Sequence, residues 1–175
     1  MRIIVIVLLS ACLWTASCER DGDEAINPIP ADYKSWHKPL DKPIEYKVVG
    51  HGNSRRIIYA NRLALQAGYV EDNFGKQAVS YPDGAIIIKE IYPKKDSGGY
   101  ESQPQLVAMV KNRAHKQSQD GWLYYSKGQN NPQPKLITSR ICSGCHEAAN
   151  ESHPYFDGNP ENTFRDYVFV KLKVP

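Results

Sequence analysis

The chain has 175 residues, of which 41% are hydrophobic and 23% charged, and this composition suits a globular domain rather than a disordered chain. The net charge is only +3 and no basic stripe dominates, so the sequence indicates no nucleic-acid partner. No apolar run reaches the roughly 20 residues that a membrane-spanning helix needs. The length matches one domain behind a short leader segment.

The N-terminus has the pattern of an export signal. A charged start is followed by an uncharged, largely aliphatic run over residues 3–18, which has the length of a signal h-region. Small residues before Cys12 and Cys18 resemble a bacterial lipoprotein box, in which the cysteine is lipidated. Cys18 gives the more usual signal length and Cys12 has the better-placed leucine, while an ordinary secretory signal without lipid is the alternative. We therefore expect residues 1–17 to be a lipoprotein-type signal peptide, and the protein to be periplasmic and lipid-anchored to a bacterial membrane.

Removal of this signal leaves few thiols. With cleavage before Cys18 and lipidation of that residue, Cys142 and Cys145 remain, so we expect no disulfide framework. We expect residues 18–43 to be a tether and N-terminal segment, flexible over 19–31, ahead of a domain at 44–175.

The patterns in that domain are mostly extended, and they predict a mainly β (α+β) fold: an antiparallel sheet with a few short helices. The expected strands are 56–60, 85–92, 106–110, 122–126 and 167–172. The expected short helices are 32–37, 62–67 and 140–149, with Asp32, Asn61 and Ser139 as candidate N-caps and Gly68 ending the second helix.

The last of these helices carries the motif with the clearest chemistry. Cys142, Cys145 and His146 form a C-x-x-C-H sequence, and on a helix these positions lie on one face. Two thiolates at this spacing can bond to one haem and the histidine can bind its iron, so the motif predicts one covalent haem c with His146 as axial ligand. The alternatives are a redox-active disulfide, an accidental structural disulfide, or a zinc site with His153 as the nearby candidate fourth ligand.

A second axial ligand is not evident. Met109 lies in an apolar run and is expected in the core, while His51 lies at a turn, where a histidine is either a surface residue or part of the distal site. His37, His115 and His153 are the other histidines. We expect an iron that is open on its distal side and free to bind a small molecule.

At this point the sequence resembles the cytochrome P-460 family, which includes the cytochrome c-prime-beta proteins. The resemblance covers about residues 44–173. The matching segments, in chain order, are His51-Gly52-Asn53 before a strand, the P-D-G-x-x-x-x-K-E pattern at 82–90, the G-W-x-x-[FY] pattern at 121–125, the haem motif at 142–146, and the D-x-V-F pattern at 166–169.

The resemblance implies a mainly antiparallel β domain with one covalent haem, usually a homodimer, with a small gaseous or nitrogen ligand and a redox partner protein. One group of the family has a lysine cross-linked to haem and oxidises hydroxylamine and nitric oxide, and Lys89 matches that lysine. The other group binds nitric oxide or carbon monoxide without turnover. Val107 falls where the oxidising group has an acid, which weakens the hydroxylamine interpretation. Without the resemblance, Lys89 would be interpreted as a strand-end lysine that reaches solvent, and a plain electron carrier remains a third function.

Overall fold

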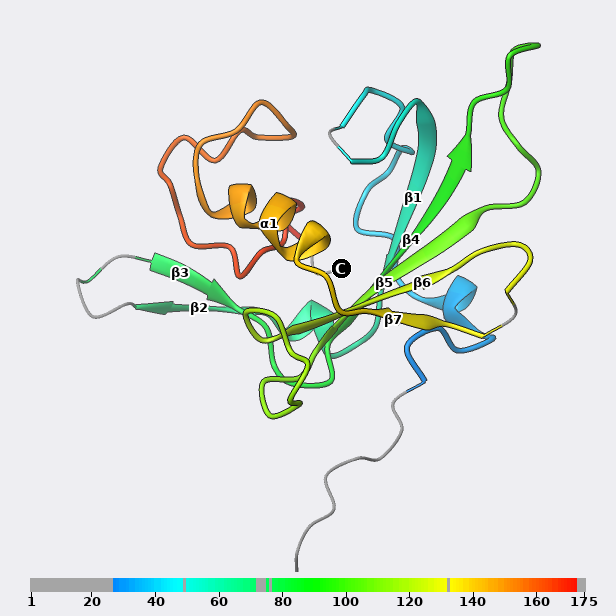
Figure 1. Cartoon of the computed structure of the whole chain (residues 1–175). Coiled ribbons are helices and arrows are strands. Elements are labelled where there is room, and N and C mark those ends of the chain that lie inside the picture. The colour runs from blue at the N-terminus through cyan, green and yellow to red at the C-terminus, as the bar shows by residue number, and fades with distance from the viewer. Residues whose placement is uncertain (1–26, 49, 72–74, 76, 132, 173–175) are drawn as a thin grey trace, which may run out of the picture.

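The computed structural model of the chain describes residues 27–172 apart from residues 49, 72–74, 76 and 132. Its centre is a five-stranded antiparallel sheet in the order β1-β4-β5-β6-β7, and a hairpin of β2 and β3 projects beside it (Figure 1). The strands are β1 Ser54–Ala60, β2 Gly68–Glu71, β3 Gln77–Ser80, β4 Ile86–Pro93, β5 Gln105–Lys111, β6 Trp122–Lys127 and β7 Lys135–Ile137. The predicted mainly β fold is confirmed.

Helical structure is sparse in the described part of the chain. The α-helix α1 spans Ile141–Glu147 and continues into the 3-10 turn η3, Ala148–Asn150. Two further 3-10 turns, η1 Tyr33–Ser35 and η2 Ala64–Gln66, stand where the first two helices were expected.

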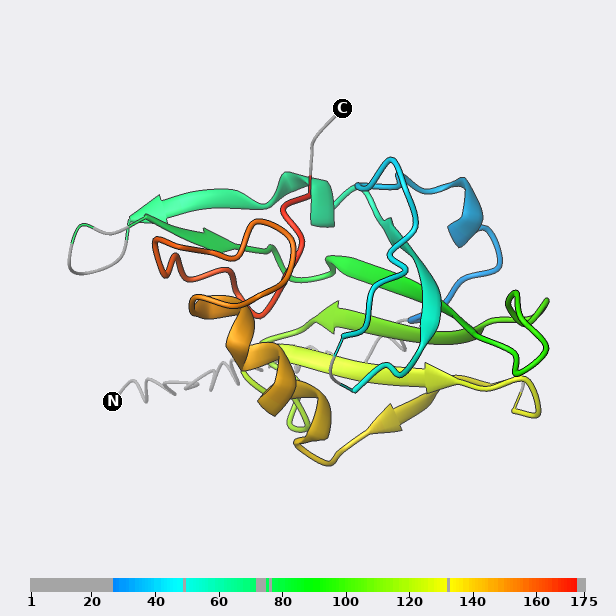
Figure 2. The same ribbon diagram turned by 90° about the horizontal axis from the view of Figure 1, so that it is seen from above.

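Both faces of the large sheet are covered, which is why β4 is almost continuously apolar (Figure 2). We call the face beneath α1 the front face; its core includes Ile58, Ile87, Met109, Tyr124 and Val168, with Cys142 packed against them. The back face is covered by the N-terminal segment; its core includes Ile29, Tyr33, Tyr59, Ile88 and Ala108. Because side chains alternate along a strand, neighbours in sequence on β4 belong to different cores.

The three predicted N-caps have different outcomes. The Asn61 side-chain oxygen accepts hydrogen bonds from the backbone N–H groups of Ala64 (2.8 Å) and Ile86 (3.0 Å), so it ties the start of η2 to β4, although Leu63 occupies the N-cap position. Asp32 occupies the N-cap position of η1, but its side chain makes no capping hydrogen bond. Ser139 does not cap α1, because Arg140 occupies the N-cap position and provides no side-chain cap.

The strand predicted at 167–172 is wrong. This segment is irregular, because Asp166 and Tyr167 both have positive φ (50° and 67°) and turn the backbone away from a strand path. The short strands β2, β3 and β7 were not predicted. All described residues of β2 are exposed, so it lacks the buried alternation that marks a strand in sequence.

The expected signal peptide, with Cys12 and Cys18, lies outside the described residues. The flexible tether was expected to run to residue 31, but Ile29 and Tyr33 are only 6% exposed and pack on the back face, so the segment joins the domain before that point. None of the helices among residues 27–172 has the length and apolarity to cross a membrane.

Candidate haem attachment site

Helix α1 is fixed to the sheet by its buried serine. Ser143 is fully buried and its hydroxyl donates to the side-chain carbonyl of Gln119 at 2.9 Å, while the Gln119 amide donates to the carbonyl of Ile137 in β7 at 3.0 Å. Ser143 is one of the two variable positions of the C-x-x-C-H motif, so sequence reasoning gave it no role. Its burial sets which side of α1 faces the sheet.

The two cysteines of α1 are free thiols in different surroundings. Cys142 is half-buried and packs against the front core, whereas Cys145 is exposed. Burial raises the pKa of Cys142, and the nearby Lys89 charge lowers it. The described residues contain no group of three or more His, Cys, Asp or Glu side chains placed to hold a metal ion, so the zinc interpretation has no ligand set among them.

His146 is held by its Nδ1 atom. Nδ1 lies 2.8 Å from the carbonyl oxygen of Tyr167, and since a carbonyl can only accept, Nδ1 carries the proton and Nε2 is the free donor atom for a metal. The ring is packed between Tyr124 and Phe169, with centroids 5.7 and 5.5 Å away. Burial, assisted by the charge of Lys89, lowers the pKa of His146 to about 4, which keeps the imidazole in the neutral form that binds metals.

Lys89 reaches the same site from β4. Its Nζ lies 2.7 Å from Nε2 of His51, and its charge acts on both Cys142 and His146. Burial, and then the charge of Arg56, lower the pKa of Lys89 to about 7, while burial, Lys89 and His146 lower the pKa of His51 to about 3. The half-buried Lys89 side chain is therefore directed toward the motif helix rather than simply into solvent. His51, which the sequence left as either a surface or a distal residue, lies in this site.

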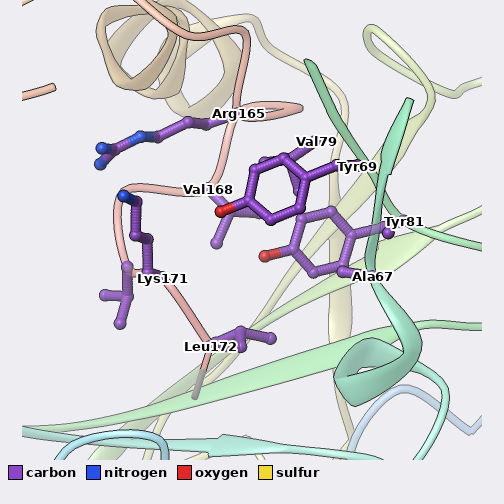
Figure 3. A pocket seen from close by; sticks show the side chains of 10 residues that line it. Ala67, Tyr69, Val79, Tyr81, Arg165, Val168, Lys171 and Leu172 are labelled. Atoms are coloured by element: carbon purple, nitrogen blue, oxygen red, sulfur yellow. The ribbon is translucent and has the colours of Figure 1, made fainter. Parts of the chain in front are cut away.

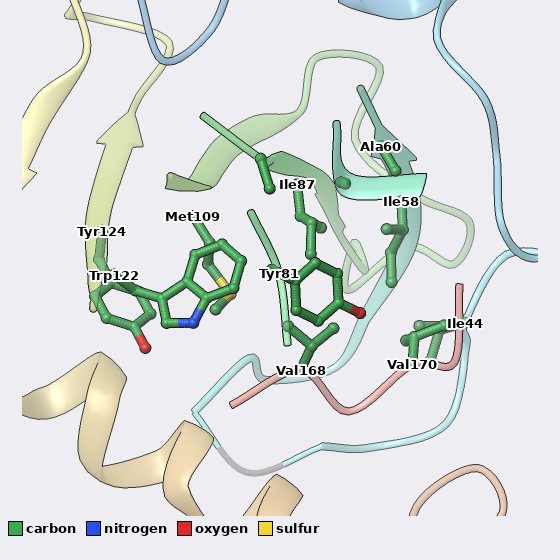
Figure 4. Close-up of a cluster of buried hydrophobic side chains, with 12 residues drawn as sticks. Ile44, Ile58, Ala60, Tyr81, Ile87, Met109, Trp122, Tyr124, Val168 and Val170 are labelled. Carbon is green, nitrogen blue, oxygen red and sulfur yellow. The ribbon is translucent and has the colours of Figure 1, made fainter. Parts of the chain in front are cut away.

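The neighbours of Lys89 on the adjacent strands are apolar, and no acid among the described residues acts on its pKa. In the register of the sheet Lys89 stands between Ile58 of β1 and Val107 of β5, and Ile87 stands next to Met109. Met109 is 8% exposed within the front core, as expected for a packing residue (Figure 4). Among the described residues, no carboxylate is a source of the pKa shifts of Lys89, His51 or His146.

Three polar residues of β1, Arg55, Arg56 and Tyr59, are divided between the two faces of the sheet. Arg56 lies on the front side, where its charge acts on Lys89 and His51. Arg55 points the other way and stacks over the rings of Tyr92 and Tyr100. Tyr59 belongs to the back core.

Two buried polar groups support the fit of a haem at this site. The Tyr124 hydroxyl is buried without a hydrogen-bond partner and points toward α1, close enough to Cys142 for their charges to interact (Figure 4). Arg56 is 1% exposed, its Nε has no partner, and its pKa is lowered by burial, with tyrosines as the only groups that oppose the shift. Buried polar groups are normally paired. A haem, which has an apolar ring and acidic side groups, fits this combination of an apolar wall, paired thiols, a free imidazole nitrogen and buried cations.

The described surface also has a small cavity away from this site. It has a volume of about 60 Å³ and lies between the β2–β3 hairpin and the C-terminal segment, with Tyr69, Tyr81, Val168 and Leu172 in its wall (Figure 3). No residue of α1 lines this cavity, so it is not part of the site that carries Cys142 and Cys145.

The chain is similar to a known protein family. A family model described as Cytochrome P460 matches residues 30–170, which is most of the chain. No curated protein matches the sequence.

Proposed function

The chain belongs to the cytochrome P460 family and is therefore a c-type cytochrome of this kind, and from this premise we propose that its haem site binds a small uncharged ligand such as nitric oxide. In this proposal one haem is attached through thioether bonds to Cys142 and Cys145, and His146 binds the iron through Nε2. When bound, the haem would supply an iron that can bind a small molecule and exchange electrons.

This proposal rests on the apolar strand neighbours of Lys89 and on the lack of an acid acting on it among the described residues. Ile58 and Val107 flank Lys89 in the sheet, and the groups whose charges act on Lys89 are Arg56 and Cys142. A neutral diatomic molecule loses little solvation on entering such surroundings, whereas the oxidising group of the family has an acid where this chain has Val107. The site thus favours binding over the oxidation of hydroxylamine.

Oxidation of hydroxylamine or nitric oxide is the second candidate, and Lys89 favours it. With a pKa of about 7 the amine is largely unprotonated in mildly alkaline solution, which is the form that can bond to carbon. A cross-link from Lys89 to haem would place this protein in the oxidising group of the family.

Absorption spectra and intact mass test both candidates on protein matured with c-type haem attachment machinery. We expect an ordinary high-spin spectrum, saturable binding of nitric oxide, and a mass equal to protein plus haem. A red-shifted ferrous Soret band, with a mass lower by the hydrogens lost in a cross-link and both reversed in Lys89→Ala, would instead establish the second candidate. A low-spin spectrum without ligand binding would make the protein an electron carrier.

The attachment itself is tested by the motif. The double variant Cys142→Ser and Cys145→Ser should lose the haem stain on a denaturing gel, because no thioether can form. A wild-type chain that never stains would overturn the whole proposal.

We also propose export with a lipid anchor at Cys18 or Cys12, electron exchange with a redox partner, and a homodimer. Tyr69 and Val70 of β2, 62% and 49% exposed, support a protein contact because large apolar side chains are costly to leave in water. Light scattering of the purified protein measures its mass in solution and so tests the homodimer.

Labelling of cells with a fatty-acid analogue tests the lipid anchor. Loss of label in Cys18→Ala or in Cys12→Ala identifies the lipidated cysteine, and absence of label in the wild type would exclude a lipid anchor.

A further inference from the structure

The segment that holds His146 is a strained turn. The Val168 N–H donates to the Arg165 carbonyl at 3.1 Å, and the two central residues, Asp166 and Tyr167, have φ of 50° and 67°. Positive φ at both central positions defines a type I′ turn, which usually contains Asn-Gly. A bulky non-glycine residue such as Tyr167 in this conformation costs about 1–3 kcal/mol and persists only where the surroundings impose it.

The first group that imposes this turn is Asn150, at the end of η3 and four residues after His146. Its side-chain oxygen accepts the backbone N–H groups of Arg165 at 2.8 Å and Tyr167 at 3.2 Å. The helical segment that carries the imidazole therefore also carries the residue that holds the turn against it.

The second group is the carboxylate of Asp166, which is 4% exposed. It accepts from Lys111 Nζ at 2.5 Å and from the Tyr81 N–H at 3.0 Å. The Trp122 indole N–H donates to the Asp166 backbone carbonyl at 2.9 Å. These contacts tie the turn to Lys111 in β5, to Tyr81 ahead of β4 and to Trp122 in β6. The turn therefore cannot relax without breaking a buried ion pair.

The result of this strain is a backbone carbonyl aimed at His146. We propose that the turn Arg165–Val168, held by Asn150 and Asp166, is a positioning device that sets the tautomer, ring orientation and basicity of His146 as haem ligand. This inference rests on the proposed function, because it concerns His146 as a ligand of iron. A hydrogen-bonded Nδ1–H makes the imidazole a stronger donor through Nε2, which favours oxidised over reduced iron.

The test compares Asn150→Ala with Asn150→Asp in the haem-loaded protein. Asn150→Ala removes the acceptor for the Arg165 and Tyr167 N–H groups, so the Tyr167 peptide is held less firmly and the hydrogen bond that its carbonyl accepts from His146 weakens, although Asp166 keeps the turn itself in place. We expect the iron–histidine stretching frequency of the ferrous protein, measured by resonance Raman spectroscopy, to fall, and the midpoint potential to rise. Asn150→Asp keeps an acceptor oxygen at the same place and should restore the wild-type stretching frequency.

Tyr167→Gly is the matched control. Glycine adopts positive φ without strain and keeps the backbone carbonyl, so the stretching frequency should stay at the wild-type value. A shift as large as that of Asn150→Ala would assign the effect to the tyrosine ring and overturn the proposal. If Asn150→Ala alone does not fold, the pair Tyr167→Gly and Tyr167→Gly/Asn150→Ala gives the same comparison in an unstrained turn.

A haem stain on each variant separates this inference from the proposed function. An unstained wild type defeats the proposed function, whereas stained variants with an unchanged stretching frequency in Asn150→Ala defeat the positioning role alone.

Discussion

Lys89 and Glu90 are neighbours on β4, yet they lie on opposite faces of the sheet in opposite environments. On the front face Lys89 contacts His51 and lies near the cation Arg56, and no described carboxylate shifts its pKa. On the back face Glu90 is 1% exposed and its carboxyl oxygens accept from the hydroxyls of Tyr33 (2.6 Å), Tyr92 (2.9 Å) and Tyr59 (3.2 Å).

The difference separates a structural face from a functional one. The three hydroxyls and the carboxyl group of the back face satisfy one another, which is how a buried polar network stabilises a fold. The front face instead keeps a lysine whose hydrogen-bond partner is the neutral His51, a buried arginine whose Nε has no partner, and an unpartnered Tyr124 hydroxyl, and no described carboxylate shifts the pKa of the lysine or the arginine. Groups held in this way are characteristic of sites that bind something else.

The largest expected effect is on the back face. Glu90→Ala leaves three phenol hydroxyls without their acceptor and should lower the free energy of unfolding by about 3–5 kcal/mol. Glu90→Gln keeps one acceptor oxygen and should cost about half as much. Denaturant unfolding measures both, with exposed Glu101→Ala as a control near zero. Because Glu90 lies across the sheet from α1, the haem spectrum should not change, and a changed spectrum would contradict the separation of the faces.

Lys89→Met tests the front face, and its effect depends on pH. The folded-state pKa of about 7 lies below the ordinary 10.5, so below pH 7 both states are protonated and the burial penalty is complete. Between pH 7 and 10.5 only the unfolded chain holds the proton, and wild-type stability rises with pH. Lys89→Met should therefore stabilise by about 2–3 kcal/mol at pH 6 and hardly at all at pH 10.5. Exposed Lys94→Met is the control, and a gain that is constant across pH would show that Lys89 does not titrate as argued.

The smallest effect comes from the tyrosines of the back face at alkaline pH. There the stability falls as the pH rises, whereas Lys89 makes the stability rise with pH. Burial and the adjacent Glu90 raise the pKa values of Tyr59 and Tyr92 to about 12 from the ordinary 10. Between pH 10 and 12 the unfolded chain has lost protons that the folded protein keeps, so stability falls as pH rises. The double variant Tyr59→Phe and Tyr92→Phe should show a shallower decline in unfolding free energy over this interval. An identical slope in wild type and variant would contradict the coupling of these phenols to Glu90.

Four strands of the large sheet, β1, β4, β5 and β6, and the haem motif could be predicted because each depends on a short stretch of sequence. The run at 85–92 and the aromatic run at 122–126 are β-rich and bounded by turn residues, and C-x-x-C-H needs only one helical turn to bring its side chains together. The family was also identified from the order of such short motifs, and the match over residues 30–170 bears this out.

The arrangement around the motif was decided only by tertiary structure. His51 meets Lys89 from 38 residues away and the Tyr167 carbonyl meets His146 from 21, through contacts that depend on how the strands pair and how the C-terminal segment folds back. Alternation along β1 separates Arg55 from Arg56, but the sequence does not say which of them faces the site. The strand predicted at 167–172 does not form, because the turn at Arg165–Val168 has positive φ at both central residues. Local preferences oppose this backbone conformation, and buried partners distant in sequence, Lys111 and Trp122, stabilise it. Local propensity determined the elements, and long-range burial and pairing determined which side chains they bring to the haem site.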